Sequence, residues 1–202
     1  MSTKLAQFLS YLLHPLFMPV YSFILVFQYN TYIAFSMPRQ VKIALFAVLI
    51  FNTVLVPAFI SYVLVKRGKV KTMQMVTKEE RLLPFLATAL FYILSSYLLY
   101  YIPLPRIFFL ILLGATITVV LGFLINTAWK ISVHMMGIGG LLGILMGMSQ
   151  RMLIDLRSPV IVGFLLAGVL GTARLRLEAH TATQLYIGFG LGFFVEFFLL
   201  VR

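Results

Sequence analysis

One polar stretch organises this chain: Ala173-Arg174-Leu175-Arg176-Leu177-Glu178-Ala179-His180-Thr181-Ala182-Thr183-Gln184. It separates two strongly apolar segments, Pro159–Thr172 and Leu185–Val201. Side chains four positions apart stack on one face of a helix, so His180 and Gln184 are expected on the same face where the last helix begins. Charged and imidazole groups beside hydrocarbon are energetically expensive and tend to be retained for function. The stretch therefore predicts an anion site at a membrane surface.

The composition indicates a membrane protein. The chain has 202 residues, of which 62% are hydrophobic and 10% charged, and its mean hydropathy is +1.06. Soluble domains carry about 25% charged residues. Apolar runs of about 20 residues recur along the sequence, and each can cross roughly 30 Å of hydrocarbon. We expect an all-α polytopic transmembrane bundle that forms a single integral-membrane domain over residues 1–202.

Seven membrane spans are expected, with six or eight as alternatives if one short segment is assigned differently. They are Ala6–Phe27, Val41–Val65, Leu82–Ile102, Ile107–Ile125, a glycine-rich span ending near Ser149, Pro159–Thr172 and Leu185–Val201. Gly139, Gly143 and Gly147 form a small-residue stripe that lets another helix approach closely, and similar stripes follow in the last two spans. The last three spans are therefore expected to form a tight sub-bundle.

With seven crossings, five polar residues emerge on the same side of the membrane: Arg81, Lys130, His134, Arg174 and His180. This agreement suggests that they form one site. Sixteen Lys and Arg against five Asp and Glu give a net charge of +11. Two explanations remain open for that excess, attraction to anionic lipid headgroups and binding of a phosphate-bearing substrate. The basic residues are scattered between spans, which argues against nucleic acid as a partner.

The polar residues favour phosphoryl transfer without metal. No HExxH motif, paired carboxylates or glycine-rich phosphate loop occurs, and the absence of cysteine excludes thiol catalysis. We therefore expect no metal or cofactor. Arginine guanidinium groups match phosphate oxygens, and a histidine can attack phosphorus or protonate a leaving oxygen. The start of the last helix adds a positive dipole end near His180.

These residues resemble the signatures of the type 2 phosphatidic acid phosphatase superfamily, which includes vanadium haloperoxidases. Arg174-x5-His180-x3-Gln184 is similar to its third signature, Ser-Arg-x5-His-x3-Asp. Ser132-Val133-His134 before a glycine-rich helix resembles the second, Pro-Ser-Gly-His, and Arg81 with Pro84 resembles the first, Lys-x6-Arg-Pro. The resemblance covers residues 71–201, which would form a phosphatase-like core.

The resemblance implies a role for each matching residue. His180 would be the nucleophile that forms a phosphohistidine, and His134 would be the acid that protonates the leaving group. Arg81 and Arg174 would bind the phosphate. Gln184, Lys78, Lys71 and Ser132 are further candidate helpers.

The sequence departs from the family pattern at several positions. Gln184 stands where the signature has aspartate, Ala173 where it has serine, and Ile131 and Val133 where it has proline and glycine. No lysine precedes Arg81 at the expected spacing. A neutral amide accepts a hydrogen bond from the imidazole but cannot stabilise an imidazolium as a carboxylate does.

The leading hypothesis is metal-independent hydrolysis of a phosphate monoester or diphosphate on a membrane lipid. One alternative is a catalytically silent relative that binds anionic lipid, and another is a small membrane transporter. The only partner implied is the lipid substrate, with no nucleic acid and no soluble protein. His14 is interpreted as a packed or interfacial side chain, and Lys130 and Arg176 as side chains that extend to lipid headgroups.

We expect the protein in a bacterial inner membrane. The side with the site carries ten Lys and Arg and the other side six, which by the positive-inside rule places the site in the cytoplasm. Members of the resembled family usually face outward, and a phosphate site itself requires cations. Our expectation is an extracytoplasmic site.

Overall fold

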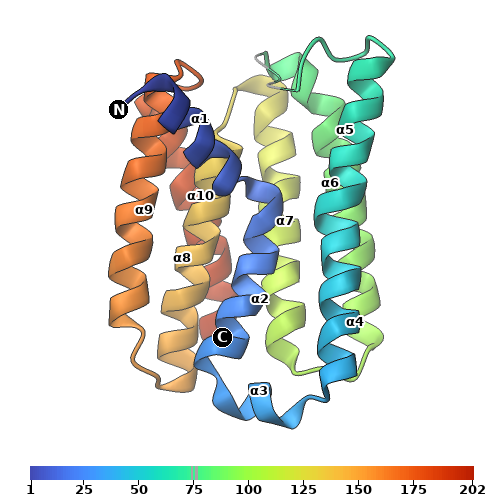
Figure 1. Cartoon of the computed structure of the whole chain (residues 1–202), viewed down its shortest axis with the longest axis vertical. Coiled ribbons are helices and arrows are strands. Elements are labelled where there is room, and N and C mark those ends of the chain that lie inside the picture. Colours follow the sequence, from blue (N-terminus) through green and yellow to red (C-terminus); the bar gives the residue numbers. More distant parts are fainter. Residues whose placement is uncertain (74, 76) are drawn as a thin grey trace.

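The computed structural model of the chain describes residues 1–73, 75 and 77–202, and every regular element within that part is a helix (Figure 1). Seven helical segments are long and apolar enough to cross a membrane, which confirms the all-α polytopic bundle. In chain order the elements are α1 (Thr3–Leu12), the 3-10 turn η1 (Pro15–Phe17), α2 (Met18–Tyr29), α3 (Thr31–Ser36), α4 (Arg39–Ile50), the π-helical turn η2 (Phe51–Leu55), α5 (Val56–Lys66), α6 (Lys78–Tyr101), α7 (Arg106–Ala128), α8 (Val133–Met152), α9 (Arg157–Arg176) and α10 (Ala182–Val201).

The spans stand side by side, and the N-terminus and C-terminus lie toward opposite ends of the bundle (Figure 1). Three connections and the N-terminus share what we call the upper end, as oriented in Figure 1. These connections join α5 to α6, α7 to α8, and α9 to α10. Arg81, Lys130, His134, Arg174 and His180 all belong to these connections or to the helix turns beside them.

The first span differs from the expected continuous helix Ala6–Phe27. It begins at Thr3 and is broken after Leu12, so α1 is inclined to α2 (Figure 1). Pro15 causes the break, because proline lacks an amide hydrogen and disfavours helical backbone in the residue before it. His14 then caps the short turn η1, since the Leu16 backbone N–H donates to its Nδ1 at 3.4 Å.

The second span and the turn before it also differ in detail from expectation. The π-helical turn η2 interrupts the span just before Pro57, where proline removes a helical donor. The connection between the first two spans contains the short helix α3, capped by the Asn30 side chain. The number of spans is therefore confirmed as seven, but helix caps and prolines shift the ends of some spans and interrupt others.

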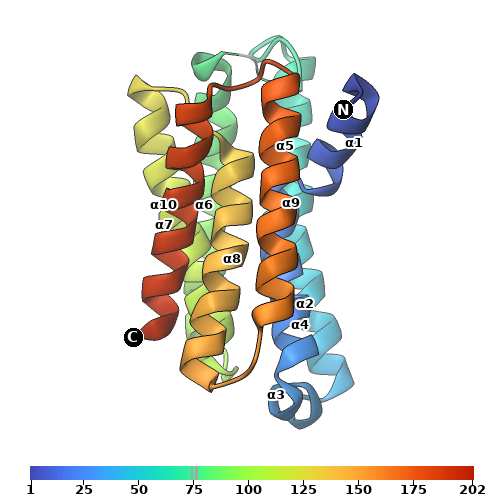
Figure 2. The ribbon, with the colours of Figure 1, turned by 90° about the vertical axis from the view of Figure 1, so that its left-hand side faces the viewer.

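The tight sub-bundle expected from the glycine stripes is centred on α8 and α10, which lie side by side in both views (Figures 1 and 2). A Cβ at Gly192 would overlap the Met136 carbonyl oxygen, and one at Gly139 would overlap the Phe189 carbonyl oxygen. These two backbones therefore touch without intervening side chains. The α9 stripe is looser, because a Cβ at Gly163 would crowd Leu142 of α8, whereas one at Gly171 would make only ordinary contacts at 3.9 Å.

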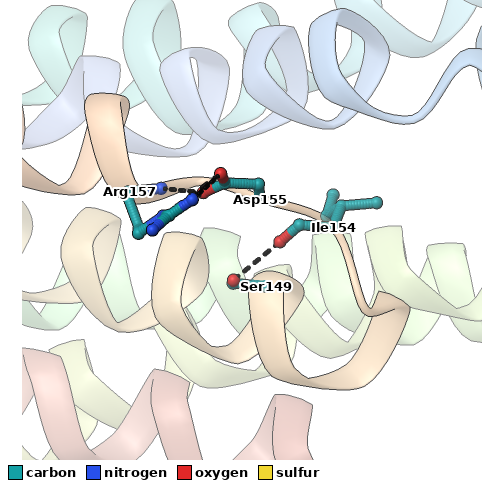
Figure 3. Close-up of polar contacts among 4 residues, drawn as sticks. All are labelled: Ser149, Ile154, Asp155 and Arg157. Carbon is teal, nitrogen blue, oxygen red and sulfur yellow. Dashed lines mark hydrogen bonds and ion pairs between the residues drawn. The ribbon is translucent and has the colours of Figure 1, made fainter.

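The turn between α8 and α9 lies at the end of the bundle opposite the upper end, and Figure 3 shows its polar contacts. Leu153 has the left-handed φ of 53° that ends α8, and the Ser149 hydroxyl donates to the Ile154 carbonyl at 2.8 Å. The Arg157 guanidinium donates to Asp155 at 2.7 Å and lowers the pKa of that exposed carboxyl to about 2. An exposed ion pair of this kind adds little stability, so the turn is held mainly by backbone geometry.

Replacing Gly192 with alanine should destabilise the protein. The added methyl group would collide with the Met136 carbonyl, and overpacking of this type costs about 1–3 kcal/mol. Thermal unfolding of the detergent-solubilised protein should show a lower midpoint for Gly192→Ala. The matched control is Gly168→Ala in open space, which should leave the midpoint unchanged or raise it. Equal midpoints for both variants would contradict the close α8–α10 contact.

Candidate functional site

A cavity of about 670 Å³ lies among the spans and reaches the upper end of the bundle. Its polar wall includes Arg81 from α6, Lys130 before α8, His134 from α8 and Arg174 from α9. Segments far apart in the sequence therefore converge on one space, as the common side of these residues suggested. Its apolar wall continues between the spans and includes Ile111, Val119 and Ile144.

The connection from α9 to α10 is shaped by two helix caps. At the end of α9 the Ala179 N–H donates to the Arg174 carbonyl and the Glu178 N–H to the Leu175 carbonyl, with Glu178 at the left-handed φ of 51°. This is the Schellman pattern of helix termination. At the start of α10, Thr181 and Gln184 form a capping box. His180 is held between these two caps, at the N-terminus of α10.

His180 is buried and makes two side-chain hydrogen bonds. An Arg81 Nη1–H lies 3.4 Å from its Nε2, and Gln184 Oε1 lies 2.9 Å from its Nδ1. Arginine can only donate, so Nε2 accepts and Nδ1–H donates to the amide oxygen. The Gln184 side chain thus fixes the tautomer that leaves a lone pair on Nε2. His180 does not line the cavity itself, because Arg81 lies on its Nε2 side.

Arg81 is a buried guanidinium held mostly by backbone. Its Nε–H donates to the Met75 carbonyl at 2.8 Å and its Nη1 to the Ile131 carbonyl at 3.3 Å. With the His180 contact, three separate segments fix its position. Among the described residues no acidic side chain pairs with Arg81, so its charge is directed to the cavity that it lines. A buried cation without a counter-ion favours an anionic ligand.

His134 and Arg174 meet at one residue of the N-terminal helix. The ring Nε2 of His134 lies 3.1 Å from the Ser10 carbonyl oxygen, and Arg174 Nη1 donates to the Ser10 hydroxyl at 3.2 Å. The Nδ1 of His134 and the Nε of Arg174 are buried and have no hydrogen-bond partner. Both atoms therefore have unused hydrogen-bonding capacity. Ser10 belongs to no motif, so nothing in the sequence indicated that α1 would reach the site.

His14 is the third histidine at this cavity. Its ring lies edge-on to the His134 ring, with centroids 5.3 Å apart, and it lines the cavity beside Arg174. The sequence interpretation placed it as a packed or interfacial side chain. The available signal for a different role was Pro15, because proline disfavours helical backbone at the residue before it, and that residue is His14.

The remaining candidates occupy different positions. Lys130, interpreted from the sequence as extending to lipid headgroups, lines the cavity; partial burial, then Arg81 and Arg174, lower its pKa. Ser132 is buried and caps α8 by accepting from the Met135 N–H. Lys78 donates to the Thr127 and Ala128 carbonyls at the end of α7, and neither it nor the exposed Lys71 lines the cavity.

Glu196 lies farther along the cavity wall, about 20 Å below His180 by helix rise along α10. It is 2% exposed, and its Oε2 has no hydrogen-bond partner. Gly114, Gly140 and Gly143 make room for this side chain, since a Cβ at any of them would meet Glu196. The cavity thus has a cationic upper part and one acidic residue deep between the spans.

The described part of the chain contains no cluster of three or more His, Cys, Asp or Glu side chains that could hold a metal ion. No protein-family model, curated protein or solved structure matches this chain. The function must therefore be inferred from these residues and their geometry.

The stability of the folded chain should depend on the neutral form of His180. Burial and then the Arg81 charge lower the pKa of His180 from 6.5 to about 3. The unfolded chain therefore binds a proton here below about pH 6.5 while the folded chain does not, so stability falls as pH falls through this window. At pH 5 the loss is about 2 kcal/mol.

Thermal midpoints at pH 7.5 and pH 5 would test this linkage. The wild type should lose more stability between the two values than His180→Asn, which retains a hydrogen-bonding side chain without a titrating ring. An identical pH dependence in the two proteins would mean that His180 is not held neutral by its surroundings.

Proposed function

We propose that this protein is a metal-independent lipid phosphatase of a bacterial inner membrane. It would hydrolyse a phosphate monoester or diphosphate through a phosphohistidine intermediate. The observation that carries the proposal is a cavity with guanidinium groups at one end and apolar walls between membrane spans. Such a cavity matches an anion attached to an apolar tail, as in phosphatidic acid, phosphatidylglycerol phosphate or a polyprenyl diphosphate. The resemblance to the type 2 phosphatidic acid phosphatase superfamily supports the same chemistry.

Binding would begin with the two arginines. The unpartnered Nε of Arg174 and the cavity-facing guanidinium of Arg81 would hold phosphate oxygens. A phosphate on Arg81 would compete with the neutral His180 ring for Nη1–H, because an anion is the stronger acceptor. That exchange would free the Nε2 lone pair of His180 beside the bound phosphorus. Gln184 would keep the proton on Nδ1 and so preserve the nucleophilic tautomer.

The chemical step would then proceed in two displacements. The Nε2 lone pair of His180 forms a bond to phosphorus while the bond from phosphorus to the lipid oxygen breaks. The leaving oxygen takes the proton of the bound phosphate's P–OH, passed to it by Nδ1 of His134, an atom that is buried and unpartnered in the structure. Water then attacks phosphorus and releases phosphate from His180; both protons of the water stay on that phosphate, and His134 is neutral again.

A second candidate is a catalytically silent protein that binds anionic lipid at the same cavity. Two observations favour it: Gln184 offers a neutral amide where the resembled signature has a carboxylate, and His180 does not line the cavity. Without a carboxylate, the imidazolium that forms in phosphoryl transfer is less stabilised. The arginines would still bind the headgroup.

The orientation that we propose places the site outside the cytoplasm. The upper end carries more Lys and Arg than the opposite end, which by the positive-inside rule alone would favour the cytoplasm. However, Arg81, Lys130 and Arg174 line the cavity and are explained by anion binding rather than by topology.

The proposed activity predicts phosphate release from lipid phosphates in the presence of EDTA. The purified protein in detergent should release phosphate from at least one of phosphatidic acid, phosphatidylglycerol phosphate or a polyprenyl diphosphate. His180→Ala should abolish release, because no other group would accept the phosphoryl group. Arg157→Ala at the opposite end is the matched control and should retain full activity. Release that persists in His180→Ala would contradict the histidine mechanism.

Restoring a carboxylate at position 184 separates the two candidates. Gln184→Asp and the length-matched Gln184→Glu keep an acceptor for the His180 Nδ1–H and add a charge that stabilises an imidazolium. At least one of them should raise kcat about ten-fold or more if the site is built for catalysis. Lipid binding without hydrolysis in the wild type and in both variants would support the silent binding protein instead.

A further inference from the structure

The hydrogen bonds of His14 and His134 leave the two rings with opposite hydrogen-bonding capacity. The Leu16 backbone N–H donates to Nδ1 of His14, so this atom is an acceptor and the ring proton lies on Nε2. The Ser10 carbonyl can only accept, so Nε2 of His134 is the donor in that contact. In neutral rings His14 therefore has an N–H left over, whereas His134 has a lone pair left over on Nδ1.

Neither of the two unused ring atoms has a hydrogen-bond partner among the residues that the structure describes. Nδ1 of His134 is buried with no partner, and no protein acceptor contacts Nε2 of His14 within the described residues. The two rings pack edge to face at 5.3 Å between centroids, and both line the cavity. A ligand at this position would meet a hydrogen-bond donor and a hydrogen-bond acceptor side by side.

Charge determines the kind of ligand. Arg174 reaches the same place, since it bonds to the Ser10 hydroxyl while His134 bonds to the Ser10 carbonyl, and its Nε is also unpartnered. Its guanidinium favours an anion. A second charge on the buried His134 beside that guanidinium would be unfavourable, which supports the neutral ring. A fully deprotonated anion would then place an oxygen lone pair against the lone pair of Nδ1.

We propose that His14 and His134 form a donor–acceptor pair that selects an oxyanion carrying one proton. The Nε2–H of His14 donates to a charged oxygen that Arg174 also holds, and the P–OH of the ligand donates to Nδ1 of His134. Inorganic phosphate keeps at least one such proton at pH 7, and a phosphate monoester carries one in its monoanionic form, which is the minor form at pH 7 because its second pKa is about 6. Sulfate has the same shape and charge without the proton. His14 is thus a ligand-binding residue contributed by the N-terminal segment.

This inference concerns the same site as the proposed function, yet it depends on binding and not on hydrolysis. The experiment measures binding of inorganic phosphate and of sulfate to the purified protein by calorimetry at pH 7 and equal ionic strength. Phosphate should bind at least ten-fold more tightly than sulfate, because a buried acceptor left facing a lone pair is strongly unfavourable. Equal affinity for the two anions would overturn the proposal, whether or not the protein hydrolyses lipids.

Two substitutions assign the roles. His14→Asn keeps an acceptor for the Leu16 N–H, because asparagine is a favourable helix cap, but is too short to replace Nε2–H. It should unfold at the wild-type temperature and bind phosphate about ten-fold more weakly. His134→Asn replaces the ring by an amide, which can rotate to donate an N–H to sulfate. The ratio of phosphate affinity to sulfate affinity should therefore be smaller in this variant. Wild-type phosphate affinity in His14→Asn, or an unchanged preference in His134→Asn, would refute the pair.

A further arm separates free phosphate from a lipid headgroup as the source of this chemistry. Phosphatidic acid in detergent micelles should displace phosphate from the wild type, and phosphatidylglycerol, whose diester has no P–OH, should not. If micelles of phosphatidic acid do not displace phosphate, the natural ligand of the His14–His134 pair is free phosphate. Displacement by phosphatidylglycerol as efficient as that by phosphatidic acid would contradict selection by the ligand proton.

Discussion

The contact between the backbones of α8 and α10 is the constraint on which the site depends. A Cβ at Gly188 would crowd the Ser132 carbonyl, and one at Gly192 would overlap the Met136 carbonyl. The start of α8, which carries His134, is thereby held at a fixed distance from the start of α10, where His180 is capped. The interaction is dispersion between closely packed main chains, which only glycine permits at these positions. Arg81 from α6 then joins the two helix starts through the Ile131 carbonyl and the His180 ring.

The buried polar groups at the site differ in how well their hydrogen bonds are satisfied. Arg81 has carbonyl oxygens for two of its donors, whereas Arg174 and His134 each retain one buried atom without a partner. Unsatisfied buried polar atoms are rare in proteins and often mark functional sites. The atoms on Arg174 and His134 belong to residues that line one cavity. Under the proposed function, a bound phosphate would supply the hydrogen-bond partners that these two atoms lack.

Hydropathy and spacing were sufficient to predict the seven spans and the common side of Arg81, His134, Arg174 and His180. Those features depend on local composition and on the parity of membrane crossings. The contribution of α1 was not predictable in the same way, because nothing in the periodicity of residues 3–12 indicates that they pack on α9 and place Ser10 between Arg174 and His134. Lys78 shows the converse: it was a candidate helper at the site, but its side chain bonds to the carbonyls at the end of α7 instead.

The parallel pairing of α8 with α10 has a consequence for biogenesis. Because α9 must cross the membrane between them in sequence, the glycine face of α8 enters the bilayer before its partner exists. The carboxyl group of Glu196 also requires the space left by Gly114, Gly140 and Gly143 to avoid lipid. Helix α10 is therefore expected to leave the translocon directly onto preassembled α7 and α8, which act as an intramolecular chaperone for the last insertion step.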